Sequence, residues 1–138
     1  MNQTLLLDAC ALVAFFANEP GGEIVSEILI SAIAKSSTIF MHKLNLLEFY
    51  YGVLRAYGKT IAEEALAMIA DSPIEIIREI SDKTFQEAAR LKAAYKISLA
   101  DSIALAEART QNASLVTCDH HEFDPLEQAE PISFLWIR

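Results

Sequence analysis

Short apolar runs alternate with longer segments along this chain. Runs of four to six residues that stop at a polar or turn residue are typical of strands buried in a parallel sheet. The run 4–7, for instance, is Thr-Leu-Leu-Leu and stops at Asp8. Five such runs predict strands, over residues 4–7, 38–41, 74–77, 114–117 and 131–136.

Between these runs, apolar residues recur at helical spacing. Ile24 and Ile28 lie four residues apart, and Thr60 and Glu63 have the spacing of a capping box that opens a helix. Helices are predicted over 9–18, 23–34 and 44–57, from residue 60 onward, and over 81–95 and 99–110, whereas 119–128 is interpreted as a polar loop. Strands that alternate with helices predict an α/β three-layer sandwich with a mostly parallel central sheet of four to five strands flanked by helices. The length of 138 residues predicts a single domain, 1–138.

Four acidic residues occupy positions that solvated acids do not. Asp8 and Asp119 each follow an apolar run, so both lie at the carboxyl ends of predicted strands, where open α/β sheets bind ligands. Glu48 interrupts an apolar stretch of a predicted helix, and Asp101 shares a helical face with Ala104. An unpaired carboxylate in apolar surroundings is costly, which favours a bound cation.

Each acid also has a purely structural interpretation. Asp8 would cap the helix that follows it, and Asp101 would be the helix-terminal acid of the sequence Ser-Leu-Ala-Asp at 98–101. Glu48 would be a solvated side chain that reaches toward Arg55, and Asp119 an ordinary turn residue. None of these interpretations explains why all four acids fall at element ends or on apolar helix faces.

The charge and composition limit the partners. The formal net charge of −8 disfavours binding of nucleic acid through a broad basic face, but carboxylate-bound divalent cations would still contact phosphate. The hydrophobic content of 53% leaves apolar surface for a partner, and the apolar positions along 44–57 and 61–69 predict a homodimer. The chain has neither a targeting signal nor an apolar run of ~20 residues, so we expect a cytoplasmic protein without a membrane segment.

The cysteines and histidines give weaker signals. Cys10 and Cys118 are interpreted as reduced, buried thiols, with a disulfide between them as the alternative. His120 and His121 lack the spacing of zinc ligands and are predicted to be loop residues. Asp124, which precedes a proline, is predicted to be a turn residue rather than a further metal ligand.

Five segments form a pattern along the chain, and four of them each contain one of the four acids. They are Leu-Leu-Leu-Asp-Ala at 5–9, Asn-Glu-Pro-Gly at 18–21, Asn-Leu-Leu-Glu at 45–48 with Tyr-Gly at 51–52, Ser-Leu-Ala-Asp-Ser-Ile-Ala-Leu-Ala at 98–106, and Ala-Ser-Leu-Val-Thr-Cys-Asp at 113–119. These segments resemble the PIN-domain nucleases, in the order of that family and over nearly the whole chain. The compact length is most similar to VapC, the toxin of type II toxin–antitoxin pairs. One departure is Cys118, because these toxins often carry a basic residue at that position.

The resemblance implies a metal-dependent endoribonuclease that is cytoplasmic, dimeric and neutralised by a co-expressed antitoxin. Two Mg²⁺ or Mn²⁺ ions about 4 Å apart would clamp the phosphodiester of the RNA substrate. Asp8 and Asp119 are assigned as direct ligands, Asp101 as a shared or water-mediated ligand, and Glu48 as a ligand or an acceptor that orients water. Thr117 is a candidate hydroxyl that supports the ligands, and Ser102 a weaker one. The aromatic side chains at 49, 50, 51 and 57 would stack on unpaired bases or belong to the core or a dimer interface.

Three other functions compete with this reading. A phosphoacceptor signalling domain also places acids at strand ends, but it needs an Asp after the third strand and a Lys after the last, which 74–81 and 131–138 lack. The low basicity favours a PIN-like binding module without catalysis, whereas the complete set of four acids argues against it. A PIN nuclease for RNA processing or quality control, rather than a toxin, is an alternative that the residues do not separate.

Overall fold

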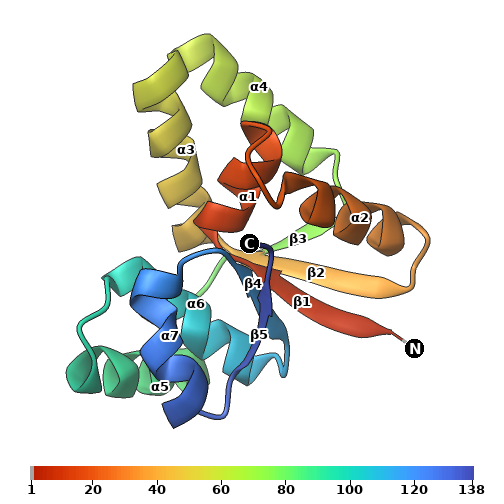
Figure 1. Cartoon of the computed structure of the whole chain (residues 1–138). Coiled ribbons are helices and arrows are strands. Elements are labelled where there is room, and N and C mark those ends of the chain that lie inside the picture. Colours follow the sequence, from red (N-terminus) through yellow and green to blue (C-terminus); the bar gives the residue numbers. More distant parts are fainter. Residues whose placement is uncertain (1) are drawn as a thin grey trace.

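The computed structural model, which describes residues 2–138, contains one sheet of five parallel strands between two layers of helices (Figure 1). The strand order in the sheet is β3-β2-β1-β4-β5. The predicted α/β sandwich is therefore confirmed. The elements in chain order are β1 (Gln3–Leu7), α1 (Ala9–Phe16), α2 (Gly22–Ile33), β2 (Ser37–His42), α3 (Lys43–Tyr57), α4 (Lys59–Ala70), β3 (Ile74–Ile77), α5 (Asp82–Ala94), α6 (Leu99–Thr110), β4 (Ser114–Thr117), α7 (His120–Ala129) and β5 (Ser133–Trp136).

The central strand β1 shows how the sheet becomes buried on both faces. Successive side chains of a strand point to opposite faces. Leu5 and Leu7 pack in a hydrophobic cluster with α1 to α4, while Leu6 packs in a second cluster with α5 to α7. In the view of Figure 1, the first group of helices lies above the sheet and the second below it. All three leucines are almost fully buried, so the apolar run without alternation is what a central parallel strand requires.

The strand order places a topological switch point between β1 and β4. The chain builds β1, β2 and β3 toward one edge of the sheet and then returns to place β4 and β5 on the other side of β1. Leu7, the last residue of β1, pairs with Val116 near the end of β4. The residues that follow these two strands are therefore neighbours, in the position where open α/β sheets bind ligands.

The structure differs from the prediction at two helix starts. The segment 119–128, interpreted as a polar loop, forms helix α7, which begins after Asp119 as N-cap. The capping box predicted at Thr60 is also wrong, because α4 already begins at Lys59 and its N-cap is Gly58. The φ of Gly58 is 89°, a backbone conformation that residues with a side chain rarely adopt. None of the helices described in residues 2–138 combines the length and the apolar character that a bilayer crossing requires.

Candidate active site

Asp8 is a buried carboxylate that also caps a helix. Its Oδ1 accepts a hydrogen bond from the backbone N–H of Ala11, and its Oδ2 accepts one from the hydroxyl of Thr117 at the end of β4. The structural interpretation of Asp8 as an N-cap is therefore correct, and it does not compete with a role in the site. Burial raises the pKa of Asp8 from 3.8 to about 7 despite the two hydrogen bonds that lower it.

Asp101 and Glu48 face the same region from two other helices. Asp101 lies in the first turn of α6, where its backbone N–H donates to the N-cap hydroxyl of Ser98. Burial, followed by the charges of Glu48 and Asp119, raises the pKa of Asp101 from 3.8 to about 7. Burial also raises the pKa of Glu48, and Asp119 adds to that shift. Glu48 forms no ion pair with Arg55 within the described residues; the Arg55 guanidinium lies instead over the ring of Tyr51, 5.6 Å from its centroid.

Asp119 completes the group as the N-cap of α7. Its Oδ1 accepts a hydrogen bond from the backbone N–H of Glu122, and its own N–H donates to the hydroxyl of Thr117. Thr117 thus contacts both strand-end acids, donating to one and accepting from the other. Glu122 is a site residue that the sequence reasoning missed, since its negative charge also raises the pKa of Asp101.

These acids form an uncompensated negative cluster. Asp101 and Asp119 raise the pKa of Asp8, while Glu48, Asp119 and Glu122 raise that of Asp101. No lysine or arginine is among the groups that shift these pKa values. Within residues 2–138, however, no three His, Cys, Asp or Glu side chains stand close enough together to hold a metal ion as they are. The acids interact through their charges without being drawn onto a common point.

The N-terminal ends of three helices partly compensate the negative charges of these acids. Asp8 caps α1, Asp119 caps α7, and Asp101 lies in the first turn of α6. The exposed N–H groups and the dipole of a helix favour negative charge at its N-terminus. Because the pKa values of Asp8 and Asp101 are nevertheless raised, the burial penalty exceeds this compensation.

Two nearby polar side chains have different roles. Ser102 donates its hydroxyl to the carbonyl of Leu99 in its own helix, so this hydroxyl is turned to the backbone rather than to an acid. The fully buried Asn45 donates its Nδ2 to the carbonyl of Ala100 over 3.1 Å, which ties the start of α3 to the start of α6. This contact fixes the two helices that carry Glu48 and Asp101.

His120 and Asp124 lie in α7, not in a loop or a turn as predicted. The Nδ1 atom of His120 lies 2.8 Å from Oδ1 of Asp124, one helical turn later, and its Nε2 atom lies 2.7 Å from the backbone oxygen of Arg138. The ring of His120 stacks on Trp136 with 3.9 Å between ring centroids. Asp124 and then the Arg138 carbonyl raise the pKa of His120. His120 therefore links α7 to Trp136 and Arg138, while Asp124 contacts the ring of His120.

The aromatic residues of α3 divide between the core and the surface. Phe49 is buried and packs edge-on against Phe16. Tyr51 and Tyr57 are exposed by 46% and 55%, on the outer side of the helix.

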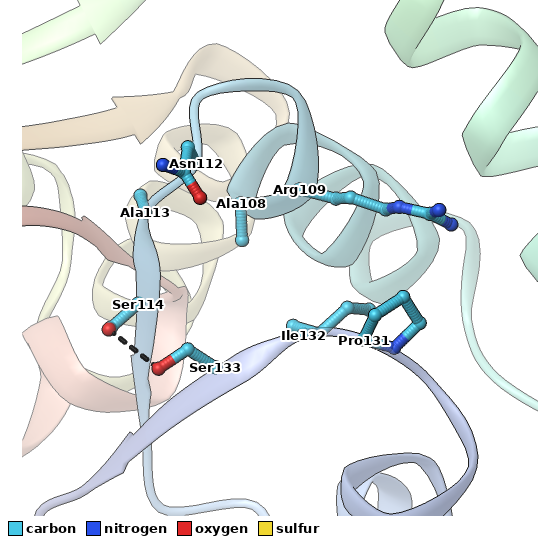
Figure 2. Close-up of a pocket in the computed structure, with 8 residues that line it drawn as sticks. All are labelled: Ala108, Arg109, Asn112, Ala113, Ser114, Pro131, Ile132 and Ser133. Atoms are coloured by element: carbon cyan, nitrogen blue, oxygen red, sulfur yellow. Dashed lines mark hydrogen bonds between the residues drawn. The ribbon is translucent and has the colours of Figure 1, made fainter.

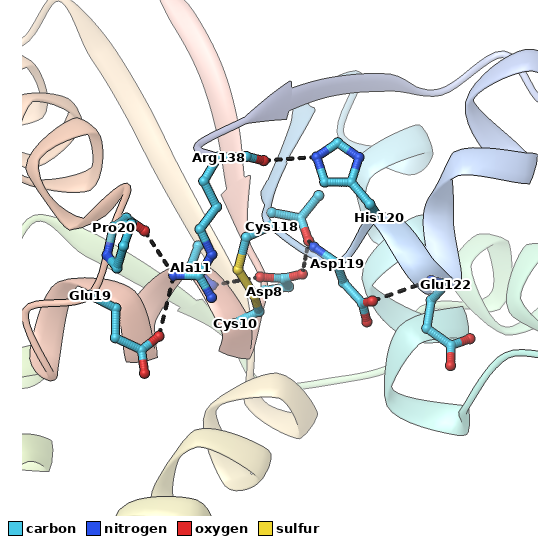
Figure 3. Close-up of a disulfide and its surroundings, with 11 residues drawn as sticks. Asp8, Cys10, Ala11, Glu19, Pro20, Cys118, Asp119, His120, Glu122 and Arg138 are labelled. Carbon is cyan, nitrogen blue, oxygen red and sulfur yellow. Dashed lines mark hydrogen bonds and ion pairs between the residues drawn. A yellow bond between two sulfur atoms is a disulfide. The ribbon is translucent and has the colours of Figure 1, made fainter.

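The prediction of reduced, buried thiols is wrong. Cys10 and Cys118 form a disulfide, and both residues are half-buried rather than buried (Figure 3). Their distance of 108 residues in sequence hid this pairing, because it is the β1–β4 contact that brings them together. The disulfide lies directly beside Asp8 and Asp119 in Figure 3.

A separate pocket lies at the amino ends of the strands, opposite the acid cluster, and no acidic residue lines it. It is formed around Ser114 and Ser133, at the amino ends of β4 and β5, whose hydroxyl oxygens lie 2.8 Å apart (Figure 2). Arg109, which also lines it, pairs with Glu87. The acid cluster is therefore the stronger candidate site.

The raised pKa values predict that the metal-free protein loses stability as the pH rises. An ordinary carboxyl group titrates at 3.8 in the unfolded chain, whereas Asp8 and Asp101 titrate at about 7 in the fold. Between these values the folded state keeps protons that the unfolded state releases, so the free energy of unfolding falls from pH 4 to pH 7 and levels off above. Urea unfolding in chelator should show a higher midpoint at pH 5 than at pH 8.

The variants Asp8→Asn and Asp101→Asn should each flatten this pH dependence and raise metal-free stability at pH 8, since each removes one of the repelling charges. The raised pKa of His120 also makes the free energy of unfolding fall as the pH rises. That contribution is the same in wild type and both variants. An unchanged difference between pH 5 and pH 8 in both variants would show that the two acids are not buried as described.

Comparisons with known proteins agree with this architecture. Residues 5–127 match the family described as PIN domain. No match was found among curated protein sequences. The chain is similar in structure to VapBC2 from Rickettsia felis bound to a promoter DNA fragment, with a TM-score of 0.73, 21% identity and coverage of 97% of this chain and 98% of that chain. VapBC-1 from Haemophilus influenzae gives a TM-score of 0.72, 15% identity and 98% coverage of both chains. Mycobacterium tuberculosis VapC20, described as a Sarcin-Ricin loop cleaving toxin, gives 0.64 and 13% with coverage of 93% and 95%. Because these sequence identities are low, the structural similarities establish the fold alone.

Proposed function

Because the chain belongs to the PIN domain family, we propose that it is a metal-dependent endoribonuclease that acts as the toxin of a type II toxin–antitoxin pair. The observation that carries the proposal is the cluster of carboxylates without a cationic partner at the carboxyl ends of β1 and β4. The similar fold of VapC20, a protein described as cleaving the Sarcin-Ricin loop, supports RNA as the substrate.

The donor set fits Mg²⁺ or Mn²⁺. Both are hard cations that prefer carboxylate oxygens and water, and the cluster offers carboxylates and no thiolate or imidazole among its core members. Asp8, Asp101 and Asp119 would hold the metal, and Glu48 would be a ligand or would orient a water molecule. A bound cation would also offset the repulsion that, after burial, contributes to the raised pKa values of Asp8 and Asp101.

The residues of the chain divide the work of phosphodiester hydrolysis. When bound, a divalent cation supplies a Lewis acid that neutralises the phosphate and makes water more acidic. Asp8 is held in one orientation by Ala11 and Thr117, so it presents a fixed carboxylate. Glu48 is only partly buried, and burial raises its pKa, which makes it a stronger proton acceptor for the attacking water than an ordinary carboxylate.

The proposed partners are an antitoxin and a second copy of the chain, in the cytoplasm. The folds compared above include VapBC toxin–antitoxin complexes, which supports an antitoxin partner. Helices α3 and α4 expose large apolar side chains that need cover. An antitoxin helix laid into an apolar groove is the recognition mode that suits such a surface. These side chains are Leu47, Tyr51, Leu54, Tyr57, Ile61 and Met68.

The purified protein is expected to cleave RNA with Mg²⁺ or Mn²⁺ and to be inactive in excess chelator, because no pair of side chains in the cluster offers a metal-free nucleophile. Cleavage of a labelled structured RNA, followed on a denaturing gel with and without chelator, measures this. Undiminished cleavage in chelator would contradict the proposal.

The toxin role predicts that induced expression arrests growth of the host cells. Co-expression of the product of an adjacent small gene should relieve this arrest. Normal growth at a high level of soluble protein would argue for a housekeeping nuclease.

A further inference from the structure

The disulfide joins the two loops that carry the strand-end acids. Cys10 lies in the first turn of α1, two residues after Asp8, and Cys118 immediately precedes Asp119 (Figure 3). Their Cα atoms lie 6.2 Å apart across the switch point between β1 and β4. The crosslink therefore sets the spacing between the β1–α1 and β4–α7 connections.

The two acids depend on this crosslink to different degrees. Asp8 is buried and bonded to both α1 and β4 without it. The hydrogen bonds of Asp119, in contrast, are all made with residues 117–123 of its own segment. Thr117 at the start of that segment donates to Asp8, and the Cys118–Cys10 bond adds a covalent tie to α1 on the other side of Asp119 from α7.

A weaker, noncovalent tie runs over the same gap. The Nη1 atom of Arg138 donates to the carbonyl oxygen of Pro20 over 2.8 Å and to Glu19 over 3.3 Å, while the backbone oxygen of Arg138 contacts His120 (Figure 3). These side chains are exposed, so their ion pair and hydrogen bonds are individually weak.

Charge repulsion acts against both ties. Beside burial, the like charges of Asp101 and Asp119 raise the pKa of Asp8, and that of Asp119 also raises the pKa of Asp101, while no lysine or arginine shifts either pKa in the other direction. Without the crosslink, the Thr117–Asp8 hydrogen bond alone would limit how far Asp119 moves away from Asp8 to reduce this repulsion. With it, Asp119 is also held covalently in the metal-free protein, so a cation has less work to do in drawing the acids onto a common point.

We propose that the Cys10–Cys118 pair is a reversible redox site whose disulfide strengthens divalent metal binding by the acid cluster. The proposal rests on the proposed function only in its assignment of a metal to that cluster. Both cysteines are half-buried, so a small thiol or disulfide in solution reaches them.

The redox step is thiol–disulfide exchange with a low-molecular-weight disulfide. The sulfur of one cysteine attacks the small disulfide, forms a mixed disulfide and releases one small thiol. The second cysteine then attacks the bound sulfur of the first, and the second small thiol leaves. The protein thiols lose two electrons and two protons in total, and the small disulfide takes up both.

The test compares Mn²⁺ binding by oxidised wild type, by wild type reduced with a phosphine that is then removed, and by the double variant Cys10→Ser/Cys118→Ser. Isothermal titration calorimetry at 20 °C should give Mn²⁺ dissociation constants about 5- to 10-fold weaker for the reduced protein and the double variant than for the oxidised protein. Reoxidation with glutathione disulfide should restore tight binding in wild type and change nothing in the double variant. Circular dichroism checks that the variant is folded, and the reduced wild type gives the answer if it is not.

A second readout follows from linkage. If oxidation strengthens Mn²⁺ binding, Mn²⁺ must make the disulfide harder to reduce by the same factor. Wild type equilibrated in glutathione buffers should therefore retain 5- to 10-fold more disulfide relative to dithiol with Mn²⁺ than without it, counted by mass spectrometry after thiol blocking.

Equal Mn²⁺ affinities of the oxidised and reduced proteins, or a thiol–disulfide equilibrium that Mn²⁺ leaves unchanged, would overturn the redox site. RNA cleavage by the same samples separates this outcome from the fate of the nuclease proposal. Different Mn²⁺ affinities without cleavage would retain the redox site and reject the nuclease, whereas cleavage with equal affinities would do the reverse.

Discussion

Replacing Asp8 with asparagine should lower kcat/KM for RNA cleavage at least about 100-fold while the protein stays folded. Asparagine is as good an N-cap as aspartate, so its side-chain oxygen would still accept the N–H of Ala11 and α1 would keep its start. What is lost is the charge that a divalent cation needs. Initial rates on a labelled RNA at saturating Mn²⁺ measure the effect.

The control is Asp71→Asn, at the exposed C-cap of α4, because Asp71 is not among the charges that shift the pKa values of the cluster. It makes the same chemical change, and we expect its kcat/KM to stay within about twofold of wild type. If Asp8→Asn keeps full activity while folded and metal-bound, the assignment of the active site to this cluster is wrong.

The sequence predicted the sheet well because its strands are short and almost purely apolar. The segments 74–77 and 114–117 were predicted with the bounds observed for β3 and β4, and 99–110 with those of α6. Turn residues and capping residues flank each of them, so pattern and boundary signals agree. The order of the strands was not predicted, since nothing local in β1 or β4 says that they are neighbours.

The same capping pattern gave one wrong helix start and one missed start. Thr60 and Glu63 have the capping-box spacing, but Gly58 already caps α4. Asp119 and Glu122 have equivalent spacing and do begin a helix, although Pro125 and the many polar residues of α7 favoured a loop. Only Phe123 and Leu126 of α7 are buried, three residues apart, which is a short apolar signal. Glu122 was missed as a member of the site for this reason.

For the acids, the structural and functional interpretations proved compatible rather than exclusive. Asp8 and Asp119 cap helices and also belong to the cluster, because each strand-to-helix connection places an N-cap at the carboxyl edge of the sheet. The sequence therefore predicted correctly that Asp8 and Asp119 follow strands of the sheet. It did not show the Cys10–Cys118 pairing, which depends on β1 and β4 being adjacent in the sheet. Metal binding and catalysis by the four acids remain predictions.

The second large effect concerns stability. The double variant Cys10→Ser/Cys118→Ser should lose about 4 to 5 kcal/mol of free energy of unfolding and melt roughly 15 °C lower than the oxidised protein, because the disulfide closes a span of 108 residues and restricts the unfolded chain. Urea unfolding with saturating Mn²⁺ and thermal melting measure these losses. Reduced wild type should resemble the double variant, which separates loss of the crosslink from the change of cysteine to serine.

Metal should change the size of this loss in a definite direction. In chelator, the variant recovers part of the lost free energy, because its acids separate and repel one another less. With saturating Mn²⁺ that relief is absent, so the loss should be about 1 kcal/mol larger than in chelator, as a 5- to 10-fold difference in Mn²⁺ affinity requires. A loss that is equal with and without Mn²⁺ would mean that the disulfide stabilises the fold without acting on the acid cluster. A reduced protein as stable as the oxidised one would instead show that the disulfide contributes nothing to the free energy of unfolding. Restriction of the unfolded chain would then not account for the disulfide.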